Sequence, residues 1–164
     1  MLCYGGSVMS AAHIPQADSL ATLRAFVGYV AERGTTLAIT AGQAAGLSPR
    51  HASYYRDAAE CLGLVQQAAD EIEVTDAARR LLATPADSPA EGRMWRRLIN
   101  GSRAIARIAP DLLGEEPPSR EAIARAIANE VGLSDSVAER RAACLRRWRK
   151  QVIEREHPQL ALPF

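Results

Sequence analysis

The sequence has no long apolar segment, few aromatic residues and almost no lysine. None of its hydrophobic stretches approaches the roughly 20 apolar residues that a membrane-spanning helix needs. Residues 1–10 also lack the basic leader and apolar core of a secretory signal. Three scattered cysteines, Cys3, Cys61 and Cys144, form neither a CxxC unit nor a secreted disulfide framework. We therefore expect a cytoplasmic protein with no membrane partner.

Aromatic residues make up only 5% of the 164 positions, whereas hydrophobic residues reach 48%. Alanine and leucine are abundant and β-branched runs are scarce, which favours helices that pack through small side chains. A chain of this length is able to bury a sizeable core. The composition predicts a mainly α protein.

Lys150 is the only lysine among 20 basic residues. Arginine binds phosphate and guanine through paired hydrogen bonds, although the codon bias of a GC-rich genome also enriches it. The formal net charge is +1, but the charge is unevenly distributed. Residues 1–92 carry 6 basic and 10 acidic side chains, whereas residues 93–150 carry 13 and 7. The positive field therefore belongs to the C-terminal half.

The stretch from Gly46 to Val65 has the boundary signals of a helix-turn-helix. Gly46 is suited to end one helix, Ser48 to cap the next, and Pro49 to occupy its first position. Spacings of three and four residues give this second helix an apolar side formed by Ala52, Tyr55, Ala58, Ala59 and Leu62. Two β-prone segments follow after a glycine and predict a hairpin wing.

Two further helices are expected before this stretch. Pro15 and Asp18 precede an apolar stripe that ends at Gly34, which predicts a supporting helix. The short first helix of the helix-turn-helix is expected within Thr35–Ala45, with Thr40 as its cap.

A second helix-turn-helix pattern follows a short proline-rich joint at residues 114–118. Its first helix is marked by Ile123, Ile127 and Val131. After a turn at residues 132–134, Ser136 and Glu139 have the spacing of a capping box at the start of a helix that extends to about Arg155. No wing is expected after this helix.

These patterns predict a mainly α fold in which a winged helix-turn-helix is followed by a helical connector and a second helix-turn-helix, with one small β-hairpin wing. Trp95 and Trp148 lie on apolar stripes and are expected in the core. The expected units are a flexible N-terminus (1–13), the winged helix-turn-helix (14–86), the helical connector (87–118), the second helix-turn-helix (119–157) and a C-terminal tail (158–164).

The free side of the helix after Pro49 carries side chains suited to the major groove of duplex DNA. Arginine pairs with guanine, while serine and tyrosine hydroxyls reach bases or phosphates. Asp57 and Glu60 lie on or near this side and dilute its positive charge, so a protein-contacting role stays open. The candidate DNA contacts are Arg50, His51, Ser53, Tyr54 and Arg56.

The last helix has a second basic side. Six cations and no acid occur between Arg140 and Lys150, a density that attracts a polyanion and predicts salt-dependent binding. The alternative is a solvated surface helix. Arg141 falls within the apolar stripe, so we expect it to be structural and to need a partner such as Glu121 or Glu130. The candidate contacts opposite that stripe, at about 100° per residue, are Ser136, Arg140, Arg147 and Lys150.

No catalytic or metal-binding pattern emerges from the sequence. Its three histidines, at positions 13, 51 and 157, lie apart from any repeated cysteine or carboxylate spacing. It has no glycine-rich phosphate loop, nucleophile elbow or zinc pattern. We expect no enzymatic activity, no metal and no cofactor.

The sequence resembles the winged-helix DNA-recognition module attached to some bacterial type II restriction endonucleases and related phage-defence proteins. The resemblance is carried by three segments, at residues 50–65, 14–18 and 139–148. The resemblance covers roughly residues 14–153. It implies sequence-specific recognition of duplex DNA, with the nuclease supplied elsewhere. The sequence ends at Phe164, soon after this region, which favours a free-standing DNA-binding protein.

Three functions stay open. The first is a non-catalytic, sequence-specific duplex DNA-binding protein that acts as a recognition component in restriction-modification or phage defence, with a nuclease as partner. The second is a dimeric transcriptional regulator, which requires a homodimer to match a palindromic site. The third is an adaptor that uses the same helix faces to bind a protein and shows no DNA binding at low salt.

Overall fold

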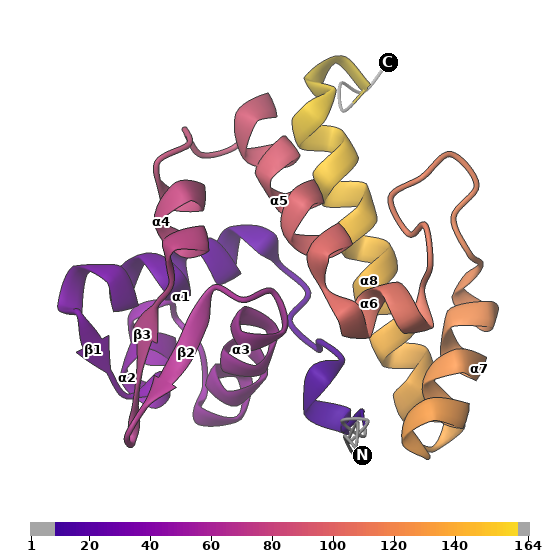
Figure 1. The fold of residues 1–164 in the computed structure, drawn as a ribbon, viewed down its shortest axis with the longest axis horizontal. Helices are drawn as coiled ribbons and strands as arrows, with labels where there is room; N and C mark the ends of the chain where they lie inside the picture. The colour runs from indigo at the N-terminus through magenta and orange to yellow at the C-terminus, as the bar shows by residue number, and fades with distance from the viewer. Residues whose placement is uncertain (1–8, 161–164) are drawn as a thin grey trace, which may run out of the picture.

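The computed structural model describes residues 9–160 and is mainly helical, as predicted. This described part contains eight α-helices and one three-stranded antiparallel sheet (Figure 1). The expected flexible N-terminus and C-terminal tail fall partly on residues 1–8 and 161–164, which lie outside the described residues. Within the described parts of both segments, Ala11–His13 and Pro158–Leu160 form short 3-10 helices, η1 and η2.

The first half of the described chain is a winged helix-turn-helix. Its elements are, in chain order, α1 (Leu20–Arg33), β1 (Thr35–Thr36), α2 (Ala38–Ala44), α3 (Pro49–Cys61), β2 (Val65–Ala68) and β3 (Glu71–Val74). β3 lies in the centre of the sheet and pairs antiparallel with both β1 and β2. Ile72 and Val74 on β3 are buried, while the glutamates beside them are only partly buried. The predicted hairpin wing is confirmed.

The boundaries of α3 agree with the sequence signals. Gly46 has a φ of +77°, which favours glycine at the end of α2. The Ser48 hydroxyl accepts a hydrogen bond from the backbone N–H of His51 at 3.3 Å, and Pro49 is the first residue of the helix. The predicted apolar side of α3 is buried, namely Ala52, Tyr55, Ala58, Ala59 and Leu62.

The start of α2 differs from the prediction. The helix begins at Ala38, directly after Leu37, so Thr40 lies inside the helix and does not cap it. The preceding Thr35–Thr36 pair forms β1, because its backbone hydrogen bonds go to β3 instead of into the helix. A two-residue strand has too short a pattern to be detected in the sequence.

The second half is a group of helices arranged around α8. Its elements are α5 (Pro89–Gly101), α6 (Arg103–Ile108), α7 (Arg120–Val131) and α8 (Asp135–Glu156). The helix before them, α4 (Asp76–Leu82), packs against α1 and β3 of the winged half and against α5. Both α5 and α7 pack along α8, and α8 runs past the winged half toward the C-terminus (Figure 1). α7 ends at Val131, Gly132 follows with a φ of +70°, and the chain turns into α8 as the second helix-turn-helix pattern predicts.

The predicted capping box of this second motif is wrong. α8 begins at Asp135, and Ser134 is the residue before the helix. Ser136 and Glu139 therefore lie within the first turns of α8 and are exposed to solvent. The predicted end of the helix near Arg155 agrees with its last residue, Glu156.

Both tryptophans are core residues, as predicted. Trp95 on α5 and Trp148 on α8 are completely buried. The Trp95 indole N–H donates to Glu91 at 3.0 Å, and that of Trp148 donates to the carbonyl of Ala17 at 2.6 Å. Each buried donor thus has a partner in the interior.

Arg141 is buried and structural, as predicted, but its expected partners are wrong. Its Nη1 donates to the backbone carbonyls of Ala11 and Ile14, at 2.7 Å from the latter, instead of pairing with Glu121 or Glu130. Burial lowers the pKa of this guanidinium.

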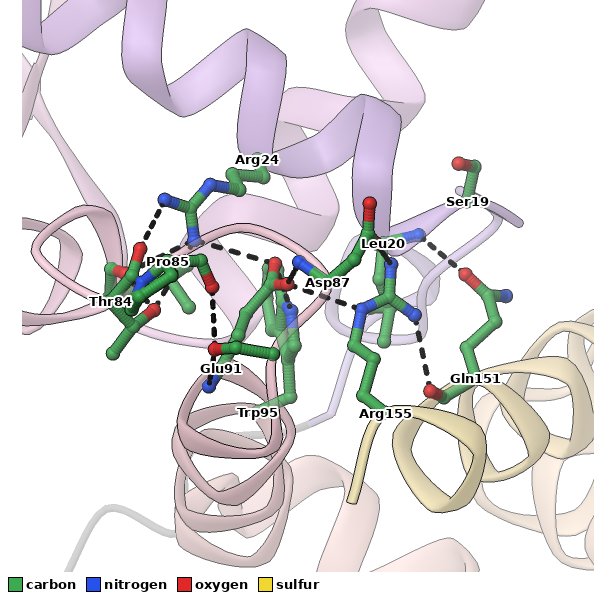
Figure 2. Close-up of polar contacts among 12 residues, drawn as sticks. Ser19, Leu20, Arg24, Thr84, Pro85, Asp87, Glu91, Trp95, Gln151 and Arg155 are labelled. Carbon is green, nitrogen blue, oxygen red and sulfur yellow. Dashed lines mark hydrogen bonds and ion pairs between the residues drawn. The ribbon is translucent and has the colours of Figure 1, made fainter. Parts of the chain in front are cut away.

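The segment that precedes α1 lies along α8 and joins the two halves. Beyond Arg141, side chains of α8 donate further hydrogen bonds to the carbonyls of Ala17 and Asp18, from Cys144, Trp148 and Gln151. Gln151 also accepts from the backbone N–H of Leu20 at 2.8 Å, at the start of α1 (Figure 2). The position of α8 relative to the winged half is therefore set by a row of direct contacts.

Candidate nucleic-acid interface

The first two turns of α3 present an ordered group of side chains, in which Arg50 and His51 are exposed and Tyr54 is half-buried. Arg50 donates from Nε to the Tyr54 hydroxyl at 2.8 Å, and its guanidinium carbon lies 5.7 Å from the centre of the Tyr54 ring. The His51 ring meets Tyr54 edge-on, with 5.8 Å between ring centres. These contacts restrict Arg50 before any ligand binds, which reduces the conformational entropy that binding costs.

The middle of α3 is less basic than its start. Arg56 is paired with the adjacent Asp57 through Nη2 at 2.9 Å, and both side chains are partly buried. Ser53 is also only partly exposed. The free positive charge of this helix is therefore concentrated at Arg50.

The six cations of α8 separate into two groups. Three of them use their guanidinium groups to bind backbone carbonyls of other segments, namely Arg141, Arg146 and Arg149. Arg146 donates to the carbonyl of Pro118, and Arg149 to those of Leu112 and Gly114. The predicted basic side is therefore smaller than the charge count suggests, and its exposed cations are Arg140, Arg147 and Lys150.

A groove lies between α3 and α8 and has a volume of about 380 Å³. Its lining brings both candidate helices together, with His51, Tyr54 and Tyr55 from α3, Arg140, Ala143 and Arg147 from α8, and Gln16 and Asp18 from the segment before α1. Arg147 pairs with Asp18 at 2.8 Å, and both side chains are more than half exposed, at 57% and 56%. Sequence reasoning missed Gln16 and Asp18 as part of this surface, because their place depends on where the segment lies on α8.

A second groove, of about 590 Å³, lies on the other side of the same α8 residues. Arg140, Ala143 and Arg147 line it together with Ser136, Glu139 and Arg120. Arg120 is the first residue of α7 and was missed by sequence reasoning. The cap at Ser119 is recognisable in the sequence, but the direction of the Arg120 side chain depends on how α7 packs against α8.

The structure places the remaining candidates outside these two grooves. Arg50, Ser53 and Arg56 lie on α3 without lining either groove. Lys150 lies on α8 beyond Arg147, with its amine 3.7 Å from the carboxylate of Glu154. His51 and Tyr54 are thus the α3 candidates that share a surface with α8.

A buried carboxylate helps to hold this geometry. Glu91 on α5 is 1% exposed, and its two oxygens accept from Trp95, the backbone of Asp87 and Arg155. Arg24 on α1 lies 3.4 Å from the same carboxylate. Figure 2 shows that these groups come from α1, the loop before α5, α5 and α8. One acidic side chain therefore connects the winged half with the helices that carry the second basic side.

Arg24 also holds the end of α4. Its guanidinium donates to the carbonyls of Leu81, Leu82 and Thr84, at 3.2, 3.3 and 2.7 Å. Leu81 and Leu82 are the last residues of α4, where carbonyls lack the usual partner four residues further on, so the arginine helps to cap the helix. The loop that enters α5 is fixed by the same contacts (Figure 2).

Comparisons with family models, curated proteins and solved structures give no significant match. Within residues 9–160, no three histidine, cysteine or carboxylate side chains are grouped as a metal site would require. None of the helices in this range is both long and apolar enough to cross a membrane.

Proposed function

We propose that this protein binds duplex DNA in a sequence-specific manner without chemistry of its own. The observation that carries the proposal is the groove between α3 and α8, which places Tyr54 and His51 on one surface with Arg140 and Arg147. A winged helix-turn-helix supplies a recognition helix of the kind that enters the major groove. The sequence resemblance suggests that the protein serves as a recognition component in restriction or phage defence, with a separate nuclease.

In this proposal the two helices have different roles. The first turn of α3 enters the major groove, where Arg50 pairs with guanine. Arg140 and Arg147 bind phosphates and set the orientation of α3, as contacts to the backbone do in protein–DNA complexes. The ion pair between Arg147 and Asp18 must break before Arg147 binds a phosphate, and this costs little because exposed ion pairs contribute only about 0–1 kcal/mol.

The phosphate contact is tested by Arg147→Ala in a salt titration of DNA binding. The variant should bind every sequence more weakly and lower the salt slope by about one unit, because one fewer counterion-releasing contact forms. Arg79→Ala is the matched control, since Arg79 is also exposed and paired with a carboxylate at 2.9 Å, but on α4. Equal slopes for the Arg147→Ala and wild-type proteins would remove α8 from the interface.

The base contact is tested by Arg50→Ala. Selection of bound sequences from a random duplex library first defines the preferred site. The variant should then lose about 1–3 kcal/mol of discrimination at one base pair while keeping the salt slope nearly unchanged. Arg33→Ala is the matched control, because Arg33 on α1 is also exposed and lies 5.1 Å from the ring centre of a tyrosine four residues away, Tyr29. Discrimination unaffected by Arg50→Ala would exclude Arg50 as the base-contacting residue.

The selection also separates this proposal from its rivals. An enriched motif supports sequence-specific binding, whereas uniform recovery of the library contradicts the specific part of the proposal. A palindromic motif bound by two copies identifies the dimeric regulator. Absence of binding at low salt overturns DNA binding as a whole and leaves the protein-binding adaptor.

A further inference from the structure

The two grooves described above adjoin each other and form one larger surface. Both are lined by Arg140, Ala143 and Arg147, which lie at the shared edge on α8. On one side the surface reaches α3, and on the other it reaches Arg120 at the start of α7. We call this combined surface, which consists of the lining residues of both grooves, the basic trough.

We propose that the DNA duplex bound by α3 continues along the basic trough to α7, where Arg120 binds its backbone. The inference rests on the proposed function and specifies the direction in which the bound duplex extends from α3. The protein then contacts DNA beyond the end of the recognised segment that faces α7. Arg120 is an additional phosphate-binding residue in this arrangement.

The charges along the trough support a polyanionic ligand. Arg120, Arg140 and Arg147 are all exposed, and among the described residues no acidic group lies within 4 Å of the Arg120 or Arg140 guanidinium. Two carboxylates also belong to the trough. Asp18 is already paired with Arg147 at 2.8 Å, whereas Glu139 lies on the second groove. The three arginines exceed the two acids, so the trough keeps a positive charge.

The shape of the trough favours close approach of the sugar-phosphate backbone of DNA. Ala143 lies one turn from Arg140 and one turn from Arg147 on the same side of α8, and its small side chain leaves the space between the two guanidinium groups open. The DNA backbone can therefore approach α8 between the two arginines without displacing a large side chain. Arginine suits this contact because its planar donors pair with phosphate oxygens.

The second groove lacks the chemistry that single strands require. Single-stranded nucleic acids are bound mainly by stacking of their bases on aromatic rings. The residues that line this groove are Arg120, Ser136, Glu139, Arg140, Ala143 and Arg147, and none of them is aromatic. A duplex, whose bases are already stacked and whose phosphates face outward, fits this part of the trough better, whereas the aromatic side chains of the trough, His51, Tyr54 and Tyr55, all line the groove beside α3.

The test uses Arg120→Ala with duplexes that carry the selected site. The variant should lower the salt slope by about one unit relative to wild type, as expected for one lost phosphate contact. Arg125→Ala is the matched control, because Arg125 is exposed on the same helix but lines a different groove, with Glu121 and Asp135, which shares only Glu139 with the trough. Circular dichroism confirms that both variants keep their helices.

The direction of the footprint is tested by shortening the flanks of the site. Removal of the flank that reaches α7 should weaken binding of the wild-type protein more than removal of the opposite flank. Arg120→Ala should make binding insensitive to the first truncation. Glu139→Gln should strengthen binding of the long duplex, because it removes a negative charge from the path of the phosphates.

The outcomes distinguish this inference from the proposed function. If Arg147→Ala lowers the salt slope but Arg120→Ala does not, the duplex ends at α8 and the inference is overturned while DNA binding stands. Equal effects of Arg120→Ala and Arg125→Ala would indicate a general charge effect and would also overturn it. Preference for single-stranded over duplex DNA contradicts the duplex assignment, and absence of binding by the wild-type protein removes both proposals.

Discussion

Replacement of Glu91 by glutamine tests how the two halves of the protein are held together. The change keeps the size of the side chain but removes its charge and converts one acceptor oxygen into a donor. Four donor groups converge on the carboxylate, from Trp95, Arg155, Arg24 and the backbone of Asp87. At least one of them must lose its acceptor in the variant.

The expected loss of stability follows from the surroundings of this carboxylate. Loss of one partner from a buried ion pair typically costs about 3–5 kcal/mol, because the remaining charge stays buried without compensation. Arg24 and Arg155 are 17% and 11% exposed and keep hydrogen bonds to backbone carbonyls. These remaining contacts place the expected loss near the lower limit, at about 3 kcal/mol. For a protein of this size the melting temperature should fall by about 6–12 °C.

The measurement is urea unfolding followed by circular dichroism and by tryptophan fluorescence. Asp76→Asn is the matched control, because Asp76 pairs with Arg79 at 2.9 Å but is 85% exposed. Its loss should cost less than about 1 kcal/mol. If Glu91→Gln unfolds at the same urea concentration as wild type, the buried carboxylate does not stabilise the contact between the two halves and the reasoning fails.

Two further predictions concern acid stability and helix packing. Hydrogen bonds from Arg96 Nε and Nη2, each 2.7 Å long, hold the pKa of Glu156 below its usual range. Their stabilisation is complete above the ordinary glutamate pKa of about 4.3 and is lost as the pH falls through the lower folded-state pKa. Glu156→Gln should therefore lower the urea midpoint at pH 7, but the midpoint should approach that of wild type in strong acid. A difference between the two midpoints that stays the same at every pH would contradict this. Gly42→Ala should destabilise the protein by about 1–3 kcal/mol in urea unfolding, because the new Cβ would lie 2.2 Å from the Cβ of Ala52. The control Gly101→Ala should not destabilise the protein, because nothing lies within 4 Å of the Cβ that it adds. Equal stability of the two variants would refute the clash at Gly42.

The proposed DNA interface depends on how the two halves meet. α3 alone offers one free cation at its first turn, since Arg56 is paired with Asp57. The groove with α8 adds Arg140 and Arg147, and it exists only because the segment before α1 lies along α8. A change that loosens this contact should therefore weaken DNA binding even when α3 itself stays folded.

Local chemistry explains which parts of the fold were predictable. Gly46, Ser48 and Pro49 mark the turn of the first motif because each acts on its own backbone or on residues within one turn. The burial of Trp95 and Trp148 followed from helical spacing. The errors at Thr40 and Ser136 have the same origin, because α2 and α8 begin after Leu37 and Ser134 without a side-chain capping hydrogen bond, so neither start has the local signal on which the prediction relied.

The sequence by itself determined the helical character, the winged motif and the basic character of the C-terminal half, because these depend on periodicity, caps and composition. Only the tertiary structure decided which cations are available to a ligand. Arg141 binds a carbonyl 130 positions away and Arg146 one 28 positions away, whereas Arg140, Arg147 and Arg120 line open grooves. Contacts between distant segments leave no local pattern, so the surface formed by α3, α8 and α7 became visible only when the chain was folded.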